Sequence, residues 1–139
     1  MRDVSVLTIA RGREAHLHNV IRGLAAQTVP PRELVIAAMQ DELYDALPDA
    51  PFPIHQIQIT RPDGELPLAA ARNAVAAKAS GSVLAFVDVD CIPHPALVAD
   101  VAEACHEGRG LVMGEVAYLP KGATEGGLDF DHFDKIGVK

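Results

Sequence analysis

The sequence predicts an α/β domain with a mostly parallel sheet and helices on both faces of that sheet. Short apolar runs alternate with segments of helical periodicity along most of the 139 residues, which is typical of right-handed β-α-β crossovers. Apolar residues make up 49% of the chain, so one domain with a sizeable core is expected. Ligands of open parallel sheets bind where the strands end, and the loops after strands are therefore the places to search for a site.

Five short apolar runs are predicted to be strands because they are rich in β-branched residues and bounded by turn residues. They cover residues 4–10, 33–39, 54–60, 83–89 and 110–119. Three helices are expected between and after them, over 12–28 (ending near Gln27), 68–80 (closed by Gly81) and 94–108. The remainder, 120–139, is glycine-rich and acidic, so we expect a domain over 1–119 and a tail over 120–139.

Composition argues against several classes of protein. A net charge of −7 and the lack of a basic block disfavour a nucleic-acid binder. No apolar run has the length of an integral membrane segment. Two cysteines, Cys91 and Cys105, are too few for a disulfide scaffold, and a cytoplasmic location is the default expectation.

Two aspartates one residue apart follow the predicted strand 83–89, in the stretch "SVLAFVDVDCIP". Side chains at i and i+2 of a strand project to the same side, so the carboxylates of Asp88 and Asp90 are expected to lie close together if the strand persists. Hard oxygen ligands in such a pair suit Mg²⁺ or Mn²⁺, which would also offset their repulsion. The alternative is that both residues face the dipole of a helix that begins near Pro95.

The surrounding sequence, "LPLAAARNAVAAKASGSVLAFVDVDCIPHPALV", resembles the region around the metal-binding D-x-D motif of family 2 glycosyltransferases. Members of that family have the GT-A fold. Their order is a small-residue helix carrying A-R-N, a glycine turn, an apolar strand, D-x-D and a helix start with proline. The resemblance covers roughly residues 4–119, and "RGREAHLHNVIRGL" with "DVDCIP" is similar to a galactosyltransferase-like subgroup.

The resemblance implies an inverting transferase that moves a sugar from a nucleoside diphosphate, with UDP-sugars favoured, to an acceptor hydroxyl. It assigns Asp88 to the nucleotide ribose and the metal side, and Asp90 to a Mn²⁺ or Mg²⁺ ion bound through the diphosphate. It also implies that Arg72, in "AARN", helps to hold the nucleotide or pyrophosphate, whereas the alternative for Arg72 is an exposed helix arginine.

The first loop departs from the family pattern. Relatives end the first strand with a Pro-Thr pair, but here the stretch is "TIARGRE", which supplies Thr8, Arg11 and Arg13 as nucleotide-binding candidates. The alternative for Arg11 and Arg13 is a solvated helix start. Relatives often carry acidic residues that read the base after the second strand, so the resemblance implies this role for Asp41, whereas the alternative for Asp41 is a helix cap.

The acceptor side is expected to be missing. Inverting enzymes need a base that takes a proton from the acceptor hydroxyl, and that base usually lies well past D-x-D. The chain runs about fifty residues beyond the motif, so we expect a fragment or a donor-binding half. Within "LDFDHFDK", Asp131 is the candidate catalytic base, and a frayed end is the alternative.

Two other functions remain open at this stage. A nucleotidyltransferase shares this type of sheet and metal-binding aspartate, although "ARGRE" lacks the usual glycine- and lysine-rich loop. A non-catalytic nucleotide-sugar-binding module is the other alternative. The expected partners are the nucleotide sugar, an acceptor that is a glycan, lipid or small molecule, and possible homodimers formed through an exposed apolar face.

Overall fold

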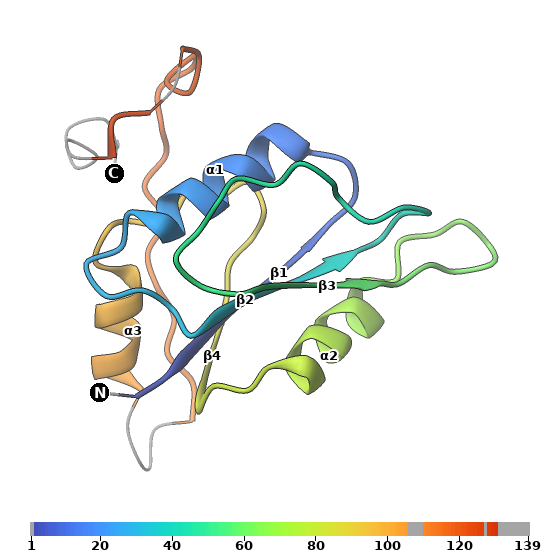
Figure 1. Cartoon of the computed structure of the whole chain (residues 1–139), viewed down its shortest axis with the longest axis horizontal. Coiled ribbons are helices and arrows are strands. Elements are labelled where there is room, and N and C mark those ends of the chain that lie inside the picture. Colours follow the sequence, from blue (N-terminus) through green and yellow to red (C-terminus); the bar gives the residue numbers. More distant parts are fainter. Residues whose placement is uncertain (1, 106–109, 127, 131–139) are drawn as a thin grey trace.

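A computed structural model describes residues 2–105, 110–126 and 128–130. The described chain forms a four-stranded parallel sheet with helices on both faces, which confirms the predicted fold class (Figure 1). The elements in chain order are β1 (Val4–Ala10), α1 (Glu14–Ala25), β2 (Glu33–Ala38), β3 (Ile54–Gln58), α2 (Leu68–Lys78), β4 (Val83–Phe86) and α3 (Leu97–Ala104).

The sheet has the strand order β3-β2-β1-β4, so β1 and β2 are its inner strands. All six residues of β2 are buried, as expected for a strand covered on both faces. In the register, Leu7 of β1 pairs with Val35 of β2 on one side and with Phe86 of β4 on the other.

Two separate apolar cores lie on the two faces of the sheet. Helices α1 and α3 cover one face, where α1 buries Leu17, Val20, Ile21 and Leu24 at helical spacing. Helix α2 covers the other face over β1 and β2 through Ala71 and Val75 (Figure 1). On the α2 side of the sheet, β4 is less covered, and its Leu84 and Phe86 are 42% and 54% exposed.

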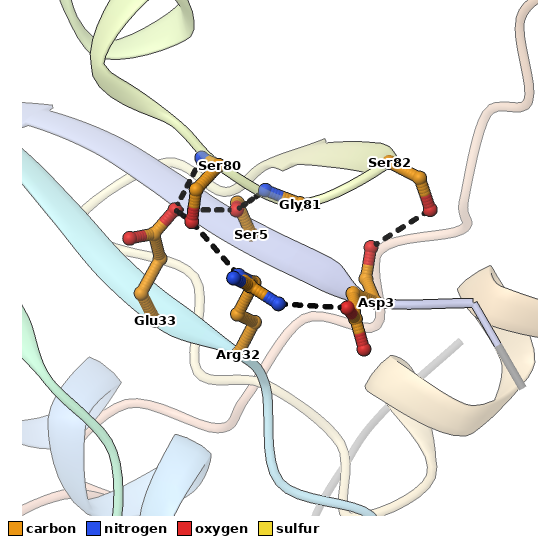
Figure 2. Close-up of polar contacts among 7 residues, drawn as sticks. All are labelled: Asp3, Ser5, Arg32, Glu33, Ser80, Gly81 and Ser82. Atoms are coloured by element: carbon orange, nitrogen blue, oxygen red, sulfur yellow. Dashed lines mark hydrogen bonds and ion pairs between the residues drawn. The ribbon is translucent and has the colours of Figure 1, made fainter.

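A polar network ties the amino-terminal ends of β1, β2 and β4 together (Figure 2). The carboxylate of Glu33, which is only 5% exposed, accepts hydrogen bonds from the Ser5 hydroxyl at 2.7 Å, the Ser80 backbone N–H at 2.6 Å and the Ser80 hydroxyl at 2.9 Å. Arg32 adds a bond to Ser80 and an ion pair with Asp3, both at 2.8 Å. The network sets the strand register at the edge opposite the loops that follow the strands.

Burial alone raises the pKa of Glu33, because it disfavours the charged carboxylate. The hydrogen bonds from Ser80 and Ser5 and the charge of His55, whose Nε2 lies 3.3 Å from Oε2, outweigh that effect. The pKa of Glu33 therefore lies below its ordinary value, and the buried carboxylate is ionised at neutral pH.

Several predicted boundaries were wrong. Strands β3 and β4 end at Gln58 and Phe86, before the predicted 60 and 89. Helix α3 begins at Leu97 rather than at 94, because residues 94–97 form a turn in which Leu97 N–H donates to His94 O at 2.9 Å. Helix α2 ends at Lys78, and Gly81 does not close it. A Cβ at Gly81 would lie 2.7 Å from the Ser5 hydroxyl oxygen, so this glycine permits close contact between backbones.

The predicted strand over 110–119 was also wrong. The segment is a coil with an isolated bridge at Tyr118, drawn in orange in Figure 1. Leu111, Met113 and Tyr118 are 83%, 86% and 76% exposed, so the segment packs against little of the described chain. An apolar, β-prone composition favours a strand, but a strand forms only where a partner supplies ladder hydrogen bonds. Among the described residues, no helix is long and apolar enough to cross a membrane.

Candidate functional site at the carboxyl ends of the strands

Five of the predicted site residues follow the strands at their carboxyl ends: Arg11, Arg13, Asp41, Asp88 and Asp90. Backbone hydrogen bonds between neighbouring strands continue past the strand ends. Val87 N–H donates to Leu7 O at 2.9 Å, and Met39 N–H donates to Ala10 O at 2.8 Å. These bonds hold the loops that begin at Arg11, Gln40 and Asp88 along one edge of the sheet.

A tight turn brings the two aspartates together. Cys91 N–H donates to Asp88 O at 2.9 Å, closing a four-residue turn just after β4. One carboxylate oxygen of Asp88, one of Asp90 and the sulfur of Cys91 all lie within 4.8 Å of one another. The expected proximity of the carboxylates is therefore observed, but the turn produces it and not a continuing strand.

The donor atoms of this turn fit a small divalent ion. Mg²⁺ and Mn²⁺ take hard oxygen ligands, and the exposed side chains of Asp88 and Asp90 leave room for further ligands from water or substrate. Burial, followed by the negative charges of Asp90 and Asp88, raises the pKa of the Cys91 thiol. Cys91 is therefore a neutral thiol at neutral pH and is poorly suited to act as a nucleophile.

Helix α1 and Gln27, two residues beyond its end, anchor the loop that follows the aspartates. The Gln27 side chain donates to His94 O at 2.7 Å and accepts the Val98 N–H at 2.9 Å. Gln27 thus caps the first turn of α3, for which no residue of α3 supplies a side-chain cap. A Cβ at Gly23 would lie 2.9 Å from Pro93 Cδ, so the helix and the loop are in close contact.

Arg13 forms an ion pair with one of the two aspartates. Its guanidinium NH1 lies 3.9 Å from Asp90 Oδ2, and both side chains are more than half exposed. Arg13 occupies the N-cap position of α1 in the left-handed conformation, with φ 50° and ψ 41° and without a side-chain capping bond. A non-glycine residue in this conformation is strained, and such strain is concentrated at functional sites.

The neighbouring Gly12 is held from both sides. Its N–H donates to Gln40 Oε1 at 2.8 Å, and its carbonyl accepts the Tyr44 hydroxyl at 2.6 Å. Gln56 fixes Tyr44 in turn, by exchanging hydrogen bonds of 2.8 Å with the Tyr44 backbone N–H and C=O. Gly12, at φ 59°, and Arg13 therefore have a defined backbone path from β1 into α1.

A pocket of about 160 Å³ lies beside this loop, at the ends of β1, β2 and β3. Its charged and amide lining residues are Arg11, Gln40, Asp41, Arg61 and Glu65. Two of the predicted nucleotide-binding residues, Arg11 and Asp41, thus line one pocket, and both are exposed.

Sequence reasoning missed Arg61. Its guanidinium pairs with Asp63 and lies 3.9 Å from Glu65 Oε2. Asp63 also accepts the Glu65 N–H at 3.1 Å, which makes it a turn residue. The charge spacing in "RPDGE" could have indicated an arginine held between two carboxylates.

Two predicted residues, Thr8 and Arg72, lie apart from this cluster. Thr8 is 1% exposed within β1, and its hydroxyl has no hydrogen-bond partner among the residues that the structure describes. Arg72 is exposed on α2 and is not a lining residue of the pocket. Asp131 lies outside the described residues.

A family model described as Glycosyl transferase family 2 matches residues 5–129. That range contains every strand and helix of the described structure except Val4, the first residue of β1. No curated protein and no solved structure gives a significant match.

Proposed function

Because the chain belongs to glycosyl transferase family 2, we propose that its loops after the strands bind a nucleoside-diphosphate sugar together with Mn²⁺ or Mg²⁺. The enzyme transfers the sugar to an acceptor hydroxyl and inverts the configuration at the anomeric carbon. The observation that carries the proposal is the convergence of Asp88 and Asp90 in one turn beside Arg13, which follows the pocket residue Arg11 by two positions in the same loop.

In this proposal, Asp90 binds the divalent ion and Asp88 faces both the ion and the ribose of the nucleotide. The ion supplies electrostatic stabilisation of the leaving diphosphate when it is bound. Exposure of both carboxylates supports this role, since a metal that bridges protein and substrate must be accessible from solvent.

The base of the nucleotide lies in the pocket at the ends of β1, β2 and β3. Asp41 accepts hydrogen bonds from the base, and the guanidinium groups of Arg11 and Arg13 face the pyrophosphate. A UDP-sugar is the favoured donor. Arg72 and Thr8 stay predictions, Arg72 as a further phosphate contact from α2 and Thr8 as a contact at the end of β1.

The reaction displaces the nucleotide in one step. The acceptor oxygen forms a bond to the anomeric carbon while the bond from that carbon to the diphosphate oxygen breaks. A base takes the proton of the acceptor hydroxyl, and Asp131 is the proposed base. The acceptor is a glycan, a lipid or a small molecule.

Calorimetric titration of the chain with UDP and GDP, each with and without Mn²⁺, tests the proposal. We expect UDP to bind only with Mn²⁺, and Asp90→Asn to weaken that binding at least about tenfold, since it removes a charged metal ligand. Asp100→Asn, a matched change at an exposed position on α3, is the control and leaves the affinity unchanged.

Equal UDP affinity in the wild type and Asp90→Asn would contradict the proposed metal site. Tighter binding of GDP than of UDP would show that the donor carries guanine rather than uracil. The proposed metal site would be unaffected by that result. Binding of a nucleotide without sugar transfer, in a chain whose circular dichroism shows a folded domain, would support the alternative of a non-catalytic nucleotide-sugar-binding module.

A further inference from the structure

We propose that Arg13 is the resident counter-cation of Asp90, that a divalent ion displaces it, and that its guanidinium then moves to the diphosphate of the donor. This inference rests on the proposed function for its last step. The first step concerns only the metal and the chain.

The pairing with Asp90 is weak enough to exchange. The distance of 3.9 Å between Arg13 NH1 and Asp90 Oδ2 is longer than a hydrogen bond, and the side chains are 58% and 55% exposed. Ion pairs of this kind contribute little to stability because water and salt screen them. A divalent ion carries twice the charge and binds the oxygen directly, so it wins the competition at modest concentration.

The pairing nevertheless offsets an unfavourable interaction. Asp88 and Asp90 lie in the same turn, and two carboxylates at such short range repel each other. Without a metal, the positive charge of Arg13 reduces that repulsion. Among the described residues, Arg13 is the arginine or lysine that forms an ion pair with this pair of carboxylates.

The backbone confines the exchange to the Arg13 side chain. Gly12 is fixed through its N–H by Gln40 and through its carbonyl by Tyr44. The Arg13 carbonyl accepts the Leu17 N–H at 3.0 Å, the first bond of α1. The Cα of Arg13 therefore stays in place, and the long side chain carries the charge from Asp90 to a phosphate at the same edge.

This arrangement predicts opposite effects on the two ligands when the charge of Arg13 is removed. Arg13→Gln frees Asp90 for the metal, so the affinity for Mn²⁺ alone rises about three- to fivefold, the size of an exposed ion pair. The same variant loses a charge-assisted bond to the diphosphate, so the affinity for UDP at saturating Mn²⁺ falls about tenfold. A merely structural role of Arg13 would move both affinities in the same direction.

The test is a titration of the full chain with Mn²⁺, followed by the electron paramagnetic resonance signal of the free ion, and then with UDP by calorimetry. Arg13→Lys keeps the charge and restores Mn²⁺ binding to near the wild-type level. Arg22→Gln makes the same change in net charge at an exposed position of α1 and leaves Mn²⁺ binding unchanged.

An unchanged or lower Mn²⁺ affinity in Arg13→Gln overturns the competition, as does the lack of Mn²⁺ binding in both proteins. A higher Mn²⁺ affinity with unchanged UDP affinity overturns the transfer of the guanidinium to the diphosphate. If UDP binds to none of the proteins while Arg13→Gln still binds Mn²⁺ more tightly, the proposed function fails and the competition stands.

Discussion

The two ends of the parallel sheet differ in how their carboxylates are buried and paired. At the amino-terminal ends of the strands, the Glu33 carboxylate is 5% exposed and accepts three short hydrogen bonds from Ser5 and Ser80 (Figure 2). At the carboxyl-terminal ends, Asp90 is more than half exposed, and the guanidinium of Arg13 lies 3.9 Å from its carboxylate. The first carboxylate is already bound by the protein, whereas the second remains available to a ligand.

The backbone follows the same division. Close contact between Gly81 and Ser5 fixes the amino-terminal end of the sheet. The loop after β1 instead keeps Arg13 in the left-handed conformation, which a side chain adopts only at a cost. The contacts at the amino-terminal end of the sheet therefore stabilise the fold. The carboxyl-terminal end contains a strained residue and exposed charges, which lower stability but leave the site accessible to a ligand.

The largest expected effect comes from removing the buried carboxylate. Glu33→Ala leaves the Ser5 and Ser80 donors without their acceptor, and we expect the free energy of unfolding to fall by about 2–4 kcal/mol. Chemical denaturation at neutral pH measures this change in the free energy of unfolding. Glu103→Ala, at an exposed position on α3, is the control and changes stability by less than about 0.5 kcal/mol. A small effect of Glu33→Ala would contradict the conclusion that the amino-terminal end of the sheet stabilises the fold.

The pH dependence of this effect sharpens the comparison. The pKa of Glu33 is lower in the folded state than its ordinary value of 4.5. Its contribution to stability is therefore complete above about pH 4.5 and is lost as the pH falls through the folded pKa. We expect the difference in unfolding free energy between the wild type and Glu33→Ala to narrow as the pH falls from neutral through the folded-state pKa of Glu33. A constant difference would show that the charge of Glu33 is not what stabilises the network.

A smaller effect is expected at Gly81. Its substitution by alanine would place a Cβ 2.8 Å from the Ser5 backbone nitrogen and 2.9 Å from the Asp3 carbonyl oxygen. Neither backbone atom can move without shifting β1, so we expect a loss of about 1–3 kcal/mol in thermal or chemical unfolding. Gly114→Ala is the matched control, because no heavy atom lies within 4 Å of the added group.

The smallest expected effect has the opposite sign. Arg13→Gly removes the side chain that makes φ 50° unfavourable, and we expect the domain to gain about 0.5–1 kcal/mol in stability. The same variant loses UDP affinity if the proposed role of Arg13 is correct. A variant that is more stable and binds less well would show directly that the carboxyl end exchanges stability for function. A loss of stability would instead make Arg13 a structural residue.

Much of this protein could be predicted from short-range patterns. Apolar β-branched runs identified four strands, and the spacing of Leu17, Val20, Ile21 and Leu24 identified α1, because burial on a sheet imposes these periods directly on the sequence. The same order of elements placed Asp88, Asp90, Arg11 and Asp41 at the ends of parallel strands.

Only the tertiary structure decided which groups meet. That Arg13 faces Asp90, that Tyr44 and Gln40 hold Gly12, and that Glu33 accepts bonds from Ser80 are contacts across 28 to 77 residues of chain. Local periodicity carries no information on such pairs. The segment 110–119 failed as a strand for the same reason, since a strand is defined by a partner that composition cannot supply.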